Sequence, residues 1–363
     1  MRYLGIDLAW GEGTQAKPAN RSGVVALESS GVIIDAGWTI GLDDTVRWIE
    51  DHSTPDVVAF VDAPLVVTNL EKQRLCETQV GQRYWQWLVS ANSTNTESPR
   101  RAGIHLRERL EALGWVYDDG TTGPPSRGQV LSECYPYTTI VGAEELGYDT
   151  ERPPYKRAQK GMPAAEAWPI RTAACDLLIS RVAGLKDHDP PADLASHEET
   201  RRLLNEPSPV VSAAYKKRED LLDAVICAWS AALWHRYGPA RCQVLGVPED
   251  GSPVGNGTII APCREAQRKA GARSLTRRRF LDIAMPERFV LEFLTDTGEW
   301  LDHGLYDAAN FERSDDGTYA CLGVGSPLYL RCLRQDGSVI YVIDGSSDPF
   351  TYRLVPFPGG GYS

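Results

Sequence analysis

The chain lacks an apolar run long enough to cross a bilayer, and its first residues lack the layout of a signal peptide. We therefore expect a cytoplasmic protein without a membrane partner. Its eight cysteines form no C-x-x-C pair, which argues against a zinc site and against a disulfide framework. The glycine-rich stretch 251–257 lacks the lysine and serine-or-threonine order of a P-loop, which argues against an ATP cradle of that kind.

Positive charge is scarce as well, with 38 lysines and arginines against 49 aspartates and glutamates, a net charge of −11 and a pI of about 5.1. This balance argues against a protein that coats nucleic acid through bulk electrostatics, but it allows a local basic track beside an acidic metal site. The hydrophobic content of 42% and the charged content of 24% are those of a globular protein. At 363 residues, the chain is long enough for one large and one smaller domain.

Strand and helix patterns alternate through the first part of the chain. We expect three consecutive strands at residues 3–9, 23–28 and 32–39, followed by a helix at 43–52. A fourth strand at 57–61, covered on both faces, a further strand at 129–135 and a long closing helix at 212–237 complete the pattern. This element order follows the RNase H fold. We therefore predict an α/β fold class, with an RNase-H-like mixed sheet flanked by helices.

The second half of the chain changes in composition. Arg268 to Arg279 carries basic residues and no acidic one, which is typical either of a solvated tether or of a nucleic-acid-binding arm. Later residues alternate apolar and polar, with hairpin signals at Asp316-Gly317 and Asp336-Gly337, which predicts a small C-terminal all-β module. We therefore expect an RNase-H-like domain at residues 1–262, a basic linker at 263–284 and a small β-rich module at 285–363.

Three aspartates occupy positions where the pattern expects buried hydrophobes. Asp7 ends the first strand, Asp62 ends the fourth, and Asp223 interrupts the closing helix. Because an unpaired buried carboxylate is costly, a shared cation is the simplest partner for all three. In the expected fold the first and fourth strands are parallel neighbours, so Asp7 and Asp62 should emerge at one edge of the sheet with Asp223 above them.

Carboxylate oxygens favour Mg²⁺ or Mn²⁺ over softer metals. Two such ions about 4 Å apart can activate a water and stabilise the leaving oxygen of a phosphodiester. We therefore assign Asp7 as a bridging ligand, Asp62 as a ligand of one ion and Asp223 as a ligand of the other.

Two further acidic residues are candidates for the same site. Asp220 lies one helical turn before Asp223, and the alternative for it is an ion pair with Lys216 or Lys217. Glu133 lies near the end of the further strand, where the alternative is an exposed glutamate on an edge strand.

Six short motifs follow one another along the chain: Gly5-Ile6-Asp7-Leu8-Ala9-Trp10, Val61-Asp62-Ala63-Pro64, Arg74 with Cys76-Glu77, Glu133-Cys134-Tyr135-Pro136, Tyr155-Lys156, and Asp220 to Ala224. Together they resemble the uncharacterised predicted-nuclease family called domain of unknown function 429. Its members are assigned to the RNase-H-like superfamily, beside Holliday junction resolvases. The resemblance covers roughly residues 1–262.

The resemblance implies catalytic roles for four acids, namely Asp7, Asp62, Glu133 and Asp223. It also implies that Arg74 either contacts a phosphate or holds Glu133. Arg74 and Lys156 are the candidate substrate-binding residues, with a solvated surface charge as the alternative for each. The chain departs from the superfamily pattern at Asp62, because many of its nucleases have a glutamate on the fourth strand.

We predict a divalent-metal-dependent nuclease that hydrolyses phosphodiester bonds of nucleic acid by a two-metal mechanism. The alternative is a non-catalytic nucleic-acid-binding or protein-binding protein of the same fold with a structural cation site. Phosphotransfer of the sugar-kinase type needs a glycine-threonine phosphate loop after the first aspartate, whereas Leu8-Ala9-Trp10 follows Asp7 here. The sequence leaves open the choice between DNA and RNA, and the oligomeric state.

Overall fold

The structure is a computed structural model that divides into two compact units, residues 1–158 with 164–272 and residues 159–163 with 273–363. It describes residues 1–13, 19–99, 101–157, 162–250, 252, 254–268, 288–294, 299–307, 309, 311–313, 319–321, 328–335, 338–343 and 352–356. Of the predicted basic linker, residues 263–268 belong to the first unit, where Gln267 is buried. Residues 269–284 of that linker lie outside the described residues.

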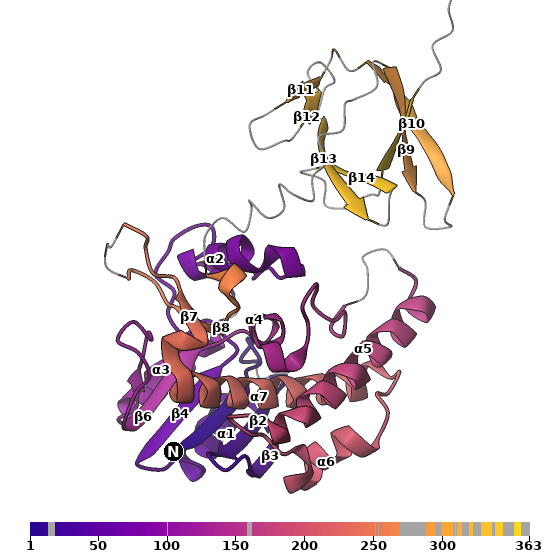
Figure 1. Cartoon of the computed structure of the whole chain (residues 1–363). Coiled ribbons are helices and arrows are strands. Elements are labelled where there is room, and N and C mark those ends of the chain that lie inside the picture. The colour runs from indigo at the N-terminus through magenta and orange to yellow at the C-terminus, as the bar shows by residue number, and fades with distance from the viewer. Residues whose placement is uncertain are drawn as a thin grey trace, which may run out of the picture. The chain divides into compact units, whose positions relative to one another are not determined.

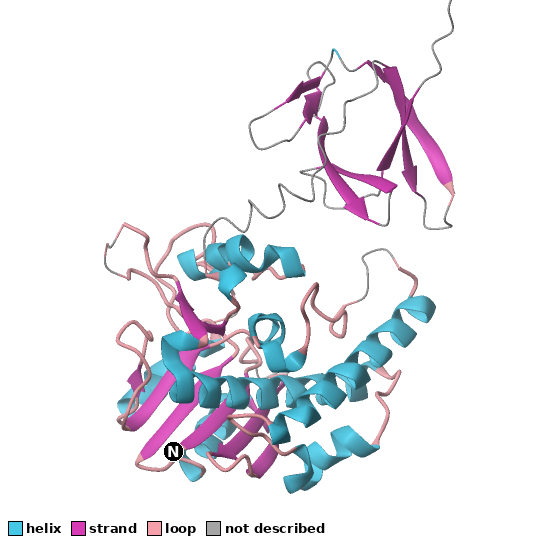
Figure 2. Cartoon of the chain, in the orientation of Figure 1, coloured by secondary structure: helices cyan, strands magenta, loops and turns pink. Residues whose placement is uncertain are grey.

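The first unit is an α/β structure with a mixed six-stranded sheet flanked by helices (Figure 1, Figure 2). Its strands run in the order β3-β2-β1-β4-β6-β5. The first three form an antiparallel meander, whereas β4, β6 and β5 run parallel to β1. Their bounds are β1 (Arg2–Asp7), β2 (Arg21–Glu28), β3 (Ile33–Ile40), β4 (Asp56–Val61), β5 (Val116–Tyr117) and β6 (Gly128–Glu133).

The helices of the first unit cover both faces of this sheet (Figure 2). They are α1 (Gly41–Asp51), α2 (Leu75–Tyr84), α3 (Ala102–Ala112), α4 (Pro136–Gly142), α5 (Ala164–Gly184), α6 (Glu198–Asn205) and α7 (Ser212–Tyr237), with a short hairpin of β7 (Cys242–Leu245) and β8 (Ile259–Pro262). No helix of the described part is long and apolar enough to cross a membrane. The predicted opening strands, the helix after them and the closing helix are confirmed, while the sequence pattern predicts neither α2 nor α4.

Strand β4 shows how the core is divided between the two faces. Val57 and Ala59 pack in a cluster with residues of α1 and α3, whereas Val58 and Phe60 pack in a second cluster with residues of α7. Because successive side chains of a strand point to opposite faces, an unbroken apolar run is what a doubly covered strand requires. The prediction of a strand buried on both faces is confirmed.

Helix α7 lies across β1, β2 and β4, and it approaches the first two strands at two glycines (Figure 1). A Cβ atom on Gly5 would lie 2.0 Å from the backbone oxygen of Ala224, and one on Gly23 would lie 2.1 Å from that of Asp220. Only glycine allows this approach of helix backbone to sheet backbone. Gly23 stands opposite Asp7 in the antiparallel register, so the contact brings the first turns of α7 next to the end of β1.

The second unit contains a seven-stranded sheet in the order β10-β9-β15-β14-β13-β12-β11, and its strand pairs are antiparallel. Gln335 of one strand pairs with Ser338 of the next, as the hairpin signal at Asp336-Gly337 predicts, although these two residues and Asp316-Gly317 are outside the described part. An all-β module therefore stays a prediction. The strands are β9 (Arg288–Leu294), β10 (Trp300–Asp307), β11 (Phe311–Arg313), β12 (Tyr319–Cys321), β13 (Leu328–Gln335), β14 (Ser338–Ile343) and β15 (Tyr352–Pro356).

The close contact of α7 with the sheet makes a stability prediction. Gly5→Ala should lower the free energy of unfolding by about 1–3 kcal/mol or more, because the added methyl group has to push the helix off the sheet. Gly37→Ala is the matched control, since a Cβ atom on this β3 residue would meet nothing within 4 Å. Urea denaturation of both variants measures the effect. Equal stability of the two would contradict the close approach.

Candidate functional site

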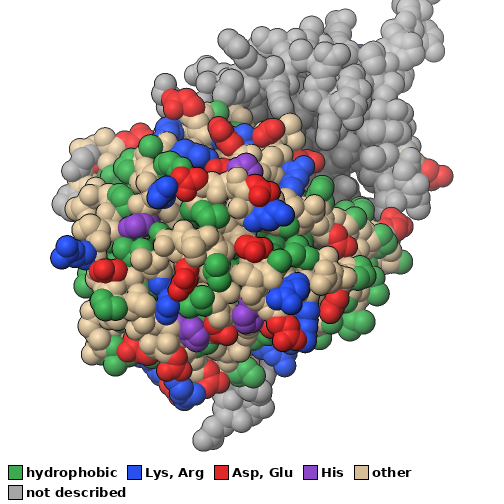
Figure 3. Space-filling view, turned by 60° about the horizontal axis from the view of Figure 1, so that its bottom comes forward, with side chains coloured by type: hydrophobic (Ala, Val, Ile, Leu, Met, Phe, Trp, Pro, Cys, Tyr) green, Lys and Arg blue, Asp and Glu red, His purple; other side chains and the backbone are tan. Residues whose placement is uncertain are grey.

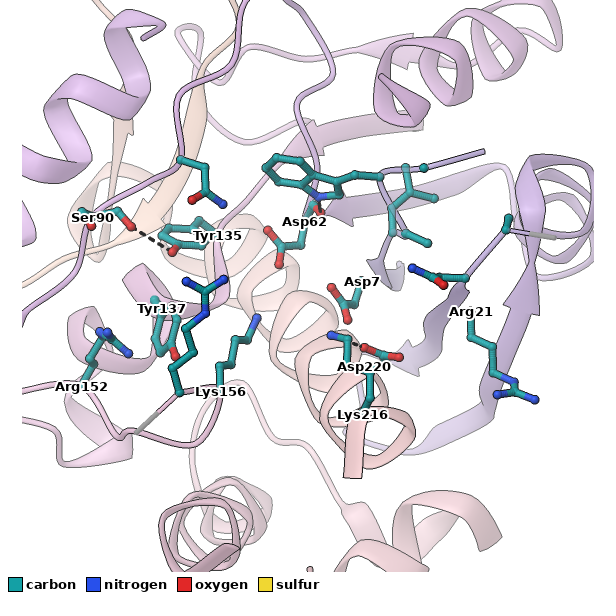
Figure 4. A pocket seen from close by; sticks show the side chains of 18 of the residues that line it. Asp7, Arg21, Asp62, Ser90, Tyr135, Tyr137, Arg152, Lys156, Lys216 and Asp220 are labelled. Carbon is teal, nitrogen blue, oxygen red and sulfur yellow. Dashed lines mark hydrogen bonds and ion pairs between the residues drawn. The ribbon is translucent and has the colours of Figure 1, made fainter. Parts of the chain in front are cut away.

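An open cavity of about 600 Å³ lies where β1 and β4 end, beside the start of α7. Its charged lining consists of carboxylates on one side and basic groups around them, namely Asp7, Asp62 and Asp220 with Arg21, Arg152, Lys156, Arg157 and Lys216. Figure 4 shows that Asp7, Asp62, Lys156 and Asp220 come together from different elements of the fold. Cations therefore outnumber carboxylates in the cavity of an acidic protein.

The ends of β1 and β4 place Asp7 and Asp62 at one edge of the sheet. The two strands are parallel neighbours, and the backbone N–H of Asp62 donates to the Ile6 oxygen at 2.8 Å. Both residues follow the alternation that points toward α7, since Phe60 packs with that helix. The prediction that these two aspartates emerge together at the carboxyl ends of parallel strands is confirmed.

Helix α7 supplies the third carboxylate of the cavity. Asp220 is buried, its Oδ1 lies 2.6 Å from Lys216 Nζ one helical turn earlier, and its carboxyl is hydrogen-bonded to that of Asp7. The ion pair that was the alternative for Asp220 is thus present. It does not remove this carboxylate from the cavity.

Asp223 lies deeper, and no part of its side chain is exposed. The Tyr155 hydroxyl donates to its Oδ1 at 2.6 Å, and Lys156 Nζ forms an ion pair with its Oδ2 at 2.6 Å. Asp223 therefore does not line the cavity, and both its oxygens are engaged. The predicted substrate-binding residue Lys156 does line it, with its ammonium group held between Asp223 and the open space.

Burial and mutual repulsion disturb the ionisation of these acids. Burial and the neighbouring Asp223, partly offset by Lys156, hold the pKa of Asp7 well above its ordinary value. Burial also raises the pKa of Asp62 to about 7, against the opposing effect of Lys156. The pKa of Lys156 is raised as well, because the attraction of Asp223, Asp62 and Asp7 outweighs the effect of burial. The charged forms of Asp7 and Asp62 are therefore disfavoured although cations line the same cavity, because burial outweighs the attraction of Lys156.

The donor chemistry fits a hard divalent cation, since carboxylate oxygens of Asp7, Asp62 and Asp220 face one space. In the part of the chain that the structure describes, however, no three acidic, histidine or cysteine side chains are arranged as a ready metal site. The ammonium group of Lys216 pairs with Asp220 instead, and that of Lys156 pairs with Asp223 behind the cavity. A metal ion could be held by the three aspartates if the lysines give way.

Glu133 and Arg74 do not line this cavity but pair with each other beside it, and the catalytic role of Glu133 and the substrate-binding role of Arg74 stay predictions. Arg74 is 1% exposed; its Nη2 donates to Glu133 Oε1 at 2.6 Å and its Nη1 to Glu133 Oε2 at 2.8 Å. Glu133 stands beside Val61 in the parallel register, so it shares the α1 and α3 face, opposite to Asp62. Of the two roles implied for Arg74, the structure has the one in which it holds Glu133.

This buried ion pair fixes the loops around the cavity. Glu133 Oε2 also accepts from the Leu65 N–H at 3.0 Å, just after Asp62, and Arg74 Nε donates to Glu77 Oε1 at 2.9 Å. Glu77 in turn accepts from the N–H of Thr94 at 2.9 Å. The network therefore holds the loop that follows Asp62 in place.

Several lining residues are not singled out by the sequence pattern. Tyr135, Tyr137 and Arg152 form one wall, and the Trp10 indole N–H donates to the Asp62 backbone oxygen at 3.1 Å (Figure 4). Trp10 and Tyr135 follow strand ends within the quoted motifs, which was a usable signal. Arg152 and Tyr137 carry no such signal, because only tertiary packing brings them to the sheet edge.

Fold and site together define an α/β protein with a charged cavity at the edge of a mixed sheet, lined by three aspartates and five basic residues. The chain belongs to the family described as Protein of unknown function (DUF429), whose model matches residues 5–249, and this confirms the resemblance at the level of the family. Comparisons with curated proteins and with solved structures gave no significant match. The family match includes all three cavity aspartates and ends before residues 273–363 of the second unit.

The raised pKa of Asp62 predicts a pH-dependent stability in metal-free protein. A carboxyl with a pKa of about 7 when folded and 3.8 as its ordinary value binds more protons in the folded state, so stability is lost as pH rises through 7. The unfolding free energy of the wild type minus that of Asp62→Asn should therefore fall, by up to about 1.4 kcal/mol per pH unit, as pH rises from 4 to 7. Urea titrations with a chelator present measure it.

The exposed Asp51→Asn on α1 is the control, and its difference from wild type should stay flat over the same range. If the stability difference between wild type and Asp62→Asn were also independent of pH, the raised pKa of Asp62 would be contradicted.

The Arg74 network makes a second prediction. Arg74→Met should lower the free energy of unfolding by about 3–5 kcal/mol, because two buried glutamates lose their shared counter-charge. Arg47→Met, which removes an exposed arginine paired with Asp44 on α1, should cost no more than about 1 kcal/mol. Chemical denaturation compares them, and a loss below 1 kcal/mol for Arg74→Met would show that the pair is not buried.

Proposed function

We propose that this protein is a divalent-metal-dependent nuclease with an RNase-H-like first domain, which hydrolyses phosphodiester bonds in DNA or RNA. The observation that carries the proposal is the convergence of Asp7, Asp62 and Asp220, with raised pKa values, on one open cavity. Perturbed carboxylates gathered in a cleft are typical of catalytic or metal sites.

The strand arrangement supports the RNase-H-like assignment. An antiparallel meander is followed by a strand parallel to β1, and the closing helix α7 lies across both (Figure 1). This is the element order on which the sequence-based prediction rested. Membership of the family matched over residues 5–249 supports the same assignment.

The distribution of basic residues supports a phosphorylated substrate. On the face of the first unit drawn in Figure 3, acidic and basic side chains are interspersed without one continuous basic area. Arg152, Lys156 and Arg157, by contrast, gather in the cavity beside the carboxylates. A polyanion would therefore be attracted to the cavity and its rim rather than to that face.

Roles follow from the position of each side chain. Mg²⁺ or Mn²⁺, when bound, would activate water and neutralise the developing charge. Asp7, Asp62 and Asp220 would hold the metal, because their oxygens face the cavity. Asp223 would become a ligand only on exchanging its ion pair with Lys156, and that ligand role stays a prediction.

One observation favours a second function. Asp223 is already neutralised by Lys156 at 2.6 Å, and the described residues contain no ready three-ligand metal site. A non-catalytic nucleic-acid-binding or protein-binding member of the fold, with these charges as structural groups, would look the same. Catalysis and metal binding therefore have to be measured separately.

The test titrates Mn²⁺ and Mg²⁺ while following cleavage of branched, single-stranded and RNA–DNA hybrid oligonucleotides. Wild type should cleave at least one of them only with metal, and Asp7→Asn or Asp62→Asn should lower the rate by about 100-fold or more. Asp51→Asn on α1 is the matched control and should leave the rate unchanged.

Metal binding without cleavage of any substrate would favour the non-catalytic function. Full metal-dependent activity in Asp7→Asn would show that the roles assigned to the aspartates are wrong.

A further inference from the structure

We propose that Arg152, Arg157, Lys156 and the Tyr137 hydroxyl form an anion subsite, which holds a phosphate of the substrate other than the one cleaved. This inference rests on the proposed function for the identity of the ligand, and it extends that function to a wall of the cavity that contains no carboxylate. Figure 4 shows Tyr137 between Arg152 and Lys156, on the opposite side of the cavity from Asp220.

Arg152 is held in place, while its terminal nitrogens stay available. Its backbone N–H donates to the Trp87 oxygen at 2.9 Å, its Nε donates to the Leu88 oxygen at 2.6 Å, and its guanidinium lies 4.5 Å from the centre of the Tyr137 ring. Within the described part of the chain, no carboxylate pairs with Arg152 or Arg157. A fixed guanidinium with free N–H groups is the arrangement that binds phosphate oxygens in two-pronged fashion.

The Tyr137 hydroxyl is a second indication that this wall binds a hydrogen-bond acceptor from a ligand. Its side chain is 7% exposed, and its buried hydroxyl has no hydrogen-bond partner among the described residues. Buried phenol groups normally find a partner, because an unmade hydrogen bond costs free energy. Lys156 Nζ lies 5.4 Å from the same ring, so a ligand oxygen held by the lysine is within reach of this part of the wall.

The two sides of the cavity are complementary to one kind of ligand. Among the described residues, no ion pair joins Asp7 or Asp62 to a cation or Arg152 or Arg157 to a carboxylate, although all four line the cavity. A phosphate chain that brings a divalent cation satisfies both sides at once. A simple carboxylate ligand would offer fewer oxygens and less charge to the basic wall.

The test measures binding in the absence of metal, so that it does not depend on cleavage. A fluorescein-labelled thymidine octanucleotide is titrated into the full chain in chelator, with anisotropy as the signal and inorganic phosphate as the competitor. Arg152→Gln should weaken binding about tenfold and reduce the slope of log affinity against log salt by about one, as loss of one phosphate contact does. Arg47→Gln removes the same charge from exposed α1 and should change neither quantity.

Tyr137→Phe separates a ligand contact from a structural one. If the hydroxyl waits for a ligand, the variant should bind the octanucleotide several-fold more weakly while its unfolding midpoint in urea stays the same or rises. A lower midpoint with unchanged binding would show a structural hydroxyl and overturn its place in the subsite. Equal binding by wild type, Arg152→Gln and Arg47→Gln would overturn the subsite as a whole.

The outcomes also separate this subsite from the proposed function. Weaker binding by Arg152→Gln without cleavage by any metal-loaded protein would support the subsite and contradict the nuclease. Metal-dependent cleavage by the wild type, together with unchanged octanucleotide binding by Arg152→Gln, would support the nuclease and contradict the subsite. Binding of inorganic phosphate that Arg152→Gln weakens, without binding of the octanucleotide, would support the anion subsite and assign it to a small phosphorylated ligand.

Discussion

The close contact of helix α7 with strands β1 and β2 is the constraint on which the site depends. Gly5 and Gly23 leave no side chain between sheet and helix, so Asp220 and Asp223 arrive beside Asp7 at the end of β1. The parallel pairing of β1 with β4 then adds Asp62 to the same edge. Backbone packing thus brings acidic side chains together, and their burial, with a smaller contribution from mutual repulsion, raises the pKa values of Asp7, Asp62 and Asp220.

Some of the opposite charges at the cavity form ion pairs, and others do not. Lys156 pairs with Asp223 and Lys216 with Asp220, whereas Asp62 and Arg152 face the same space without pairing with each other. Such an arrangement is unfavourable for the empty protein and favourable once a cation and an anion enter together. The buried pair of Arg74 with Glu133 belongs to the scaffold that keeps the Asp62 loop in place.

Periodicity predicted the opening meander, the doubly buried β4 and the full extent of α7, because each has a strong hydrophobic pattern. It also placed Asp7 and Asp62 together. The surroundings of Glu133 were not predictable, because its carboxylate is held by Arg74 from a distant segment; its catalytic role stays a prediction. Helix α4 was missed because its run of threonine, isoleucine and valine favours a strand over a helix. The ion pair between Asp223 and Lys156 joins distant segments and has no local signal.

The most direct measurement is an anomalous difference map from crystals soaked with Mn²⁺ at pH 8, above the pKa of about 7 of Asp62. The account predicts density within bonding distance of the Asp7 and Asp62 carboxylates, with a lysine displaced from the cluster. A map without metal density in this cavity, and with Lys156 still paired to Asp223, would contradict it.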